Sequence, residues 1–117
     1  MKIWKPLGAS AAVLALAATT AQAETRVTYK SAKTTSSYYQ MAVQIAEAMK
    51  KGSNGGIIVT VEESQGSVQN VKEAAVRSGN YVFTTPPVLV KLAQNGAAMF
   101  KAKPNPKFKE IRALFPI

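Results

Sequence analysis

The chain has 117 residues, of which 15 are Lys or Arg and 6 are Asp or Glu, so its formal net charge is +9 at pH 7. It contains no His and no Cys, which excludes imidazole and thiol catalysis, disulfide bonds and zinc sites built from these ligands. A chain of this length forms at most one small domain, whose stability depends on its apolar core.

The first residues have the three regions of a secretory signal peptide. Two lysines open the chain, residues 7–18 form an apolar stretch, and residues 21–23 read Ala-Gln-Ala, a cleavage pattern. The apolar stretch is shorter than the roughly 20 residues that a membrane-spanning helix needs. We therefore expect residues 1–23 to be a cleaved signal peptide, with an uncleaved anchor as the alternative, and we expect a periplasmic protein that begins at Glu24.

Residues 26–30 predict a first strand, and a helix follows it. Ser37 to Gln40 reads Ser-Tyr-Tyr-Gln, a capping box that predicts a helix capped by Ser37 and ending at Gly52. Apolar spacings of three and four residues predict the buried stripe of this helix. Its members are Tyr38, Met41, Ala42, Ile45, Ala48 and Met49.

The next segment predicts a second strand and a second helix. Residues 57–61 are continuously apolar, which is typical of an interior strand of a parallel sheet, covered on both faces. The second helix is expected to begin with Ser67 as its cap and to end at residues 78–79. It carries Val68, Val71, Ala74 and Ala75 inward.

Two further strands and one helix complete the predicted order. Residues 81–83 predict a third strand, and Thr85 is expected to cap a third helix whose first turn contains Pro86 and Pro87. Its expected apolar face consists of Val88, Leu89, Leu92 and Ala93. Residues 111–115 predict a fourth strand. This alternation predicts an α/β fold, an open parallel sheet with helices on both faces.

Three polar segments follow the three strands, at the edge of a parallel sheet where ligands bind. Residues 33–37, 64–67 and 84–87 contain no acidic residue, and helix starts of this kind suit an anion. For any one segment, ordinary helix capping is the competing explanation. The candidate ligand-binding residues are Thr35, Ser36, Ser37, Tyr38, Gln65, Gly66, Ser67, Thr84 and Thr85. Lys33 could add a positive charge or be simply solvated, and the helical stripe takes Tyr38 toward the core.

The sequence favours binding over catalysis. Glu62 and Glu63 are consecutive at a strand end, so their side chains should face opposite sides and cannot form an acid/base pair. We predict no catalytic residue, no metal and no cofactor, and hence no enzyme. The cluster of Lys101, Lys103, Lys107 and Lys109 is interrupted by prolines and has only Phe108 as a stacking aromatic. Nucleic acid is therefore not expected as a partner.

Four segments carry a family resemblance: residues 31–51, 57–79, 81–100 and 111–117. They resemble the start of the TAXI-type extracytoplasmic solute-binding proteins of TRAP transporters. The most specific part is the helix start of residues 66–70, Gly-Ser-Val-Gln-Asn, and the next is that of residues 36–39, Ser-Ser-Tyr-Tyr.

The resemblance implies a two-lobed type II periplasmic-binding-protein fold. Such a protein would capture a small organic anion, a carboxylate such as an amino acid or a dicarboxylate, for TRAP-type membrane permease subunits. The family's ligand loops map onto residues 35–38, 65–67 and 84–85. Residues 31–35 lack the glycines that many relatives have in this loop.

We expect residues 24–117 to form a partial solute-binding lobe, because the second lobe of the family is missing from this sequence. Residues 111–115 would then lack a neighbouring strand and form an exposed edge. The alternative function is that of a small secreted basic interaction protein that binds an anionic surface or polymer.

Overall fold

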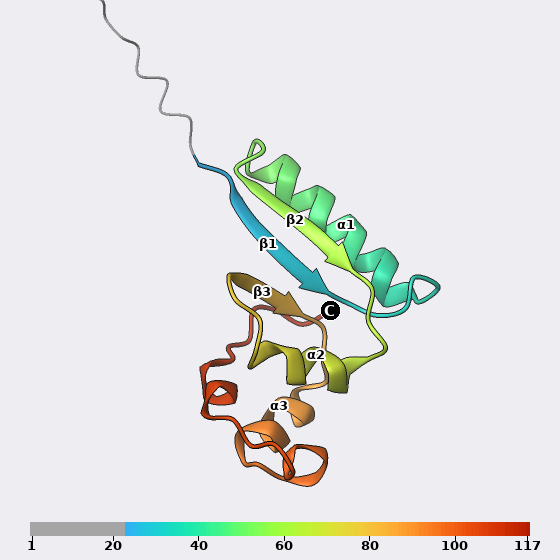
Figure 1. Cartoon of the computed structure of the whole chain (residues 1–117). Helices are drawn as coiled ribbons and strands as arrows, with labels where there is room; N and C mark the ends of the chain where they lie inside the picture. The colour runs from blue at the N-terminus through green and yellow to red at the C-terminus, as the bar shows by residue number, and fades with distance from the viewer. Residues whose placement is uncertain (1–22) are drawn as a thin grey trace, which may run out of the picture.

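The structure is a computed structural model that describes residues 23–117 (Figure 1). The predicted signal peptide, residues 1–23, lies outside the described residues except for Ala23. Within residues 23–117, three strands and three helices alternate, and two short 3₁₀ helices follow. The elements are β1 (Thr25–Lys30), α1 (Ser37–Gly52), β2 (Ile57–Glu62), α2 (Ser67–Ala74), β3 (Asn80–Phe83), α3 (Pro87–Gln94), η1 (Ala98–Phe100) and η2 (Pro106–Glu110).

The strands form one parallel sheet in the order β2-β1-β3. The chain crosses from β1 to β2 in one direction and from β2 past β1 to β3 in the other. Right-handed crossovers then place α1 and α2 on opposite faces of the sheet, as Figure 1 shows. The predicted α/β class, an open parallel sheet with helices on both faces, is confirmed.

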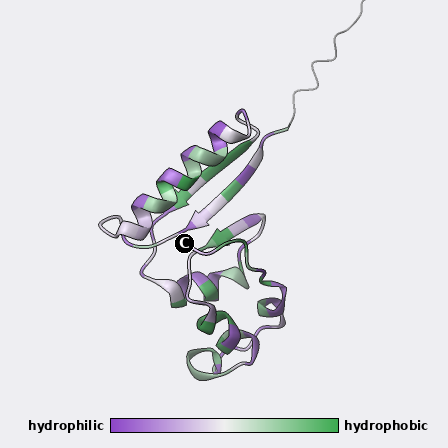
Figure 2. Ribbon diagram, turned by 180° about the vertical axis from the view of Figure 1, so that it is seen from behind, coloured by the Kyte–Doolittle hydropathy of each residue, from purple (hydrophilic) through white to green (hydrophobic). Residues whose placement is uncertain are grey.

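The strand order corrects one prediction. β2 was expected in the interior of the sheet, but among the described strands it pairs only with β1 and lies at an edge. The first strand of the chain, β1, is the central one. Figure 2 shows hydrophobic residues along β2, and their partial burial comes from α1, which packs on this strand. A continuous apolar run shows that a strand is covered, but not how many strands flank it.

Helix α1 packs on the sheet through alanines. Ala42 and Ala46 are buried, one turn apart, and their small side chains let the helix lie close to the strands. The predicted stripe was wrong at both ends, because Tyr38, Ala48 and Met49 are exposed. Tyr38 lies in the first turn, beside the loop that leads into α1, where it contributes little to the contact with β2.

The largest buried cluster lies on the other face and involves both 3₁₀ helices. Its fully buried members are Val71, Ala75, Ala93, Phe100 and Phe108. The rings of Phe100 and Phe108 meet edge to face, with their centroids 5.5 Å apart. These contacts join α2 and α3 to η1 and η2. Val71 and Ala75 are buried as predicted, whereas Val88 of the predicted α3 face is exposed.

Two expected boundaries differ from the structure. Helix α2 ends at Ala74 rather than at residues 78–79. The predicted fourth strand over residues 111–115 is not formed, and Leu114 and Phe115 are exposed. A strand requires a partner for its backbone N–H and C=O groups, and none of the described strands is hydrogen-bonded to these residues.

Candidate functional site

The three strands end level with one another, and their loops meet at that edge of the sheet. Lys30 is in register with Glu62 on one side and with Phe83 on the other. Backbone hydrogen bonds continue past the strands, from Ser31 N to Glu62 O (3.1 Å), from Ser64 N to Ala32 O (3.0 Å) and from Thr84 N to Lys30 O (3.2 Å). The structure therefore brings the three predicted polar segments together.

The first loop ends at the start of α1, where Thr35 and Ser37 are exposed and Ser36 is half-buried. Ser36 is the N-cap, and its hydroxyl oxygen accepts a hydrogen bond from the backbone N–H of Tyr38 (3.2 Å). The predicted position of the cap, Ser37, is thus wrong by one residue, and the predicted capping box of residues 37–40 does not form. Tyr38 is 48% exposed, so its predicted place in the core is also wrong.

The second loop leads into α2 through Gly66, which has a φ of 143° and serves as the N-cap. Residues other than glycine rarely adopt this backbone angle. A Cβ at this position would nevertheless meet no atom within 4 Å. Because glycine has no side chain to cap the helix, α2 begins without a side-chain cap. The predicted capping role of Ser67 is wrong, since Ser67 is the first helical residue, while Gln65 is exposed.

The third loop holds Thr84 and Thr85 in different ways. The hydroxyl groups of Thr84 and Tyr29 are hydrogen-bonded at 2.7 Å. The hydroxyl of Thr85 donates to the carbonyl of Pro86 (3.2 Å), and Pro86 rather than Thr85 occupies the N-cap position of α3. The residue before a proline is disfavoured in the helical conformation, so the pair Pro86-Pro87 delays the helix by one residue relative to the prediction.

Asn70 of α2, which the sequence analysis did not select, ties the three loops together. Its side-chain amide donates to Ser31 O and to Thr84 O, each at 2.9 Å. Its side-chain oxygen accepts from the Ser64 hydroxyl. We call Asn70, Ser31, Ser64 and Thr84 the Asn70 hub. Asn70, Ser31 and Ser64 are also the buried polar residues of the described part of the chain.

One sequence signal could have identified Asn70. It lies directly before Val71 and four residues before Ala74, both of which the helical pattern directs inward. An amide at such a position is buried and therefore requires hydrogen-bond partners. The sequence alone did not indicate which carbonyls these partners would be.

A charge cluster lies beside the hub, between the ends of β1 and β2 and helix α2. It consists of Lys30, Glu62, Glu73 and Arg77. The shortest ion pair joins Arg77 to Glu62 at 2.8 Å. This hydrogen bond with Arg77, together with the nearby positive charges, lowers the pKa of Glu62 from its ordinary 4.5. Partial burial acts in the opposite direction but is outweighed. The cluster balances its own charges and leaves none of them for a ligand.

Tyr81 connects the charge cluster to the hub. Its hydroxyl donates to the backbone carbonyl of Asn70 (3.0 Å), and the Arg77 guanidinium lies 5.3 Å from the centre of its ring. The ordinary pKa of a phenol, 10.0, already keeps it protonated as a donor at neutral pH, and burial raises the pKa of Tyr81 further. The loop edge is therefore held by hydrogen bonds that do not titrate near neutrality.

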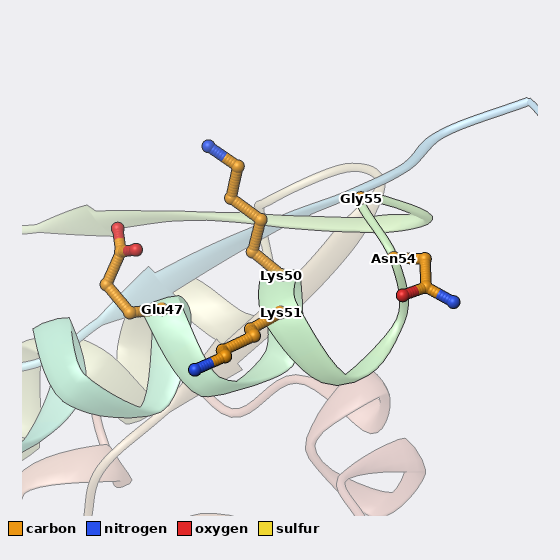
Figure 3. Close-up of a pocket in the computed structure, with 5 residues that line it drawn as sticks. All are labelled: Glu47, Lys50, Lys51, Asn54 and Gly55. Atoms are coloured by element: carbon orange, nitrogen blue, oxygen red, sulfur yellow. The ribbon is translucent and has the colours of Figure 1, made fainter.

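A pocket in the structure lies away from these loops, at the opposite end of α1 (Figure 3). It is lined by Glu47, Lys50, Lys51, Asn54 and Gly55. Lys50 and Lys51 lie in the last turn of the helix, where cations offset its dipole. The pocket contains none of the predicted site residues.

The described residues contain no group of three or more acidic side chains arranged to hold a metal ion. Among the same residues, no helix is long and apolar enough to span a membrane. Glu63 is exposed, whereas Glu62 belongs to the charge cluster, so the two neighbouring carboxylates have separate environments.

A protein-family model described as NMT1-like family matches residues 30–117 of the chain. The match covers well over half of the sequence and includes all three loops and the whole Asn70 hub. No curated protein and no solved structure gives a significant match.

Replacement of Asn70 by alanine should loosen the loop edge. The variant Asn70→Ala leaves the carbonyls of Ser31 and Thr84 without their donor, and we expect a loss of about 2–4 kcal/mol in the free energy of unfolding. Chemical denaturation measures this loss. The matched control Asn95→Ala, at an exposed position after α3, should change it by less than about 0.5 kcal/mol. Equal stabilities for the two variants would contradict the hub.

The charge cluster should make stability depend on acidity. Because the folded pKa of Glu62 is lowered, its contribution is present above its ordinary pKa of 4.5 and is lost as the pH falls through the folded pKa. Denaturation midpoints measured between about pH 6 and pH 3 should therefore fall less steeply for Glu62→Gln than for the parent protein. Glu63→Gln, the exposed neighbour, should follow the parent. A parallel decline in all three proteins would refute the coupling.

Proposed function

The chain belongs to the NMT1-like family, a family of periplasmic solute-binding proteins, and from this premise we propose that it captures a small organic anion for a TRAP-type permease. A small-molecule ligand and a membrane transporter are the partners of a solute-binding family. We propose further that the chain is of the TAXI type and that its ligand is a carboxylate, such as an amino acid or a dicarboxylate.

The observation that carries this proposal is the convergence of three polar loops at one sheet edge, held by a buried amide. The carboxyl edge of a parallel sheet is where such folds bind ligands. Helix α2 begins there without a side-chain cap, so its first N–H groups and the positive end of its dipole suit a carboxylate. Within residues 31–37, 64–67 and 84–87 no acidic side chain would repel it.

Some polar groups of the loop edge are bonded within the fold, which supports assigning the ligand contacts to the others. Ser31, Ser64 and Asn70 are buried and bonded to one another's loops. We propose that the ligand contacts come from the predicted residues of the three loops, of which Thr84 has its carbonyl and hydroxyl already bonded within the fold. These are Thr35, Ser36, Ser37, Tyr38, Gln65, Gly66, Ser67, Thr84 and Thr85. Of these, Thr35, Ser37, Tyr38 and Gln65 are exposed.

The first test concerns the ligand contact at α2. Ser67→Ala removes a hydroxyl beside the uncapped helix start, and we expect carboxylate binding to weaken at least about tenfold, because hydrogen bonds to charged groups contribute about 1.5–3 kcal/mol. Ligand-detected NMR with a panel of mono- and dicarboxylates measures it. Lys72→Ala, exposed on the same helix, is the control and should keep the affinity of the parent. The site is wrong if Ser67→Ala and Thr35→Ala stay folded and bind unchanged.

The second test concerns export. The family is extracytoplasmic, and we propose that residues 1–23 direct this chain across the membrane and are then removed. Intact-mass analysis of protein from the periplasmic fraction should give a chain that starts at Glu24. A mass that retains the first 23 residues would indicate an uncleaved anchor instead.

A further inference from the structure

Positive charge is concentrated at the end of the molecule formed by α3, η1 and η2. Six cationic residues lie between residues 91 and 112, against one acidic residue, Glu110. We call these six residues the basic end. They are Lys91, Lys101, Lys103, Lys107, Lys109 and Arg112. The rest of the described chain, residues 23–90, carries five acidic residues and is close to balanced.

The cations of the basic end have no carboxylate partners. Every ion pair found among residues 23–117 joins side chains between Glu24 and Arg77. The six side chains of the basic end are exposed. Their charges are therefore available to an external anionic surface, whereas Lys30 and Arg77 are neutralised within the fold.

The backbone beneath these cations is fixed by the core. Phe100 and Phe108 are 1% and 3% exposed, and Phe108 anchors η2 with Lys107 and Lys109 on either side of it. Two hydrogen bonds add to this anchor, from the Gln94 amide to Phe108 O (3.1 Å) and from Lys107 N to the Asn105 side chain (2.9 Å). The result is a packed, hydrogen-bonded backbone that carries exposed ammonium groups.

We propose that the basic end binds an anionic lipid surface through the phosphates of its headgroups. Five of the six cations are lysines, compact point charges on flexible stems that attract headgroup phosphates without requiring a fixed geometry. Val88 of α3 and Met99 of η1 are the large apolar side chains exposed on these elements, two against six cations, which points to peripheral attachment through charge. Figure 1 shows α3 running from the loop edge toward this end, so attachment would leave the loops uncovered.

The experiment is co-sedimentation of the exported protein with vesicles of phosphatidylcholine, with and without about 30% phosphatidylglycerol. The parent should bind the anionic vesicles and not the neutral ones, and added salt should release it. A variant with Lys101, Lys103, Lys107 and Lys109 all replaced by glutamine should lose binding by at least tenfold, since each lysine near such a surface contributes up to about fivefold. The same four positions replaced by arginine should bind like the parent.

The matched control removes the same charge elsewhere. It replaces Lys33, Lys50, Lys51 and Lys72, all exposed, by glutamine and should bind within about threefold of the parent. Equal losses in the two glutamine variants would overturn the proposal in favour of net charge alone. Retention of the parent on an immobilised acidic protein but not on anionic vesicles would overturn it in favour of a protein partner. This proposal does not depend on the carboxylate site, whose variants are tested separately.

Discussion

The arrangement of the loop edge depends on one buried side-chain amide. Asn70 offers two donors and one acceptor in a single plane, and all of them are used, by loops that follow three different strands. Aspartate would present no donor to the carbonyls of Ser31 and Thr84, and an apolar residue would leave both of them unpaired. Because the three bonds meet at one buried point, the position of each loop is set relative to the other two.

The hydrogen bonds of Asn70 divide the polar groups of the loop edge into two classes. The Ser64 hydroxyl and the Thr84 carbonyl are hydrogen-bonded to Asn70, so they cannot bind a ligand unless these bonds of the hub break. Other groups are not bonded to Asn70. These are the exposed hydroxyls of Thr35 and Ser37 and the backbone N–H groups at the uncapped start of α2. The charge cluster supports the same division, since Lys30 lies near the edge but is held between two carboxylates. Selectivity for an anion would then rest on hydrogen-bond donors and on the exposed Lys33 of the first loop rather than on Lys30.

The sequence was informative wherever a local rule decides the structure. Apolar patterns predicted the first three strands, their helices and the fold class, because such a pattern is set within one element. The prediction failed where the structure of a segment depends on contacts with another segment. Residues 111–115 have strand character but pair with none of the described strands, and β2 was misplaced because strand order is a property of the sheet. Caps were wrong by one residue where neighbours share the same chemistry, as at Ser36 and Ser37. Asn70 was missed because its role consists of contacts up to 39 residues away in the chain.

The central place of β1 also bears on the order in which the molecule can fold. The first strand to leave the ribosome or an export channel is the one that later pairs on both sides. It must wait for Ile57–Glu62 and then for Asn80–Phe83 before its backbone groups are satisfied. Each pairing closes a long loop, a topology of high contact order that slows folding. Until residue 83 has emerged, β1 remains a strand with a free edge, and it is then that a chaperone would have most effect on the yield of native protein.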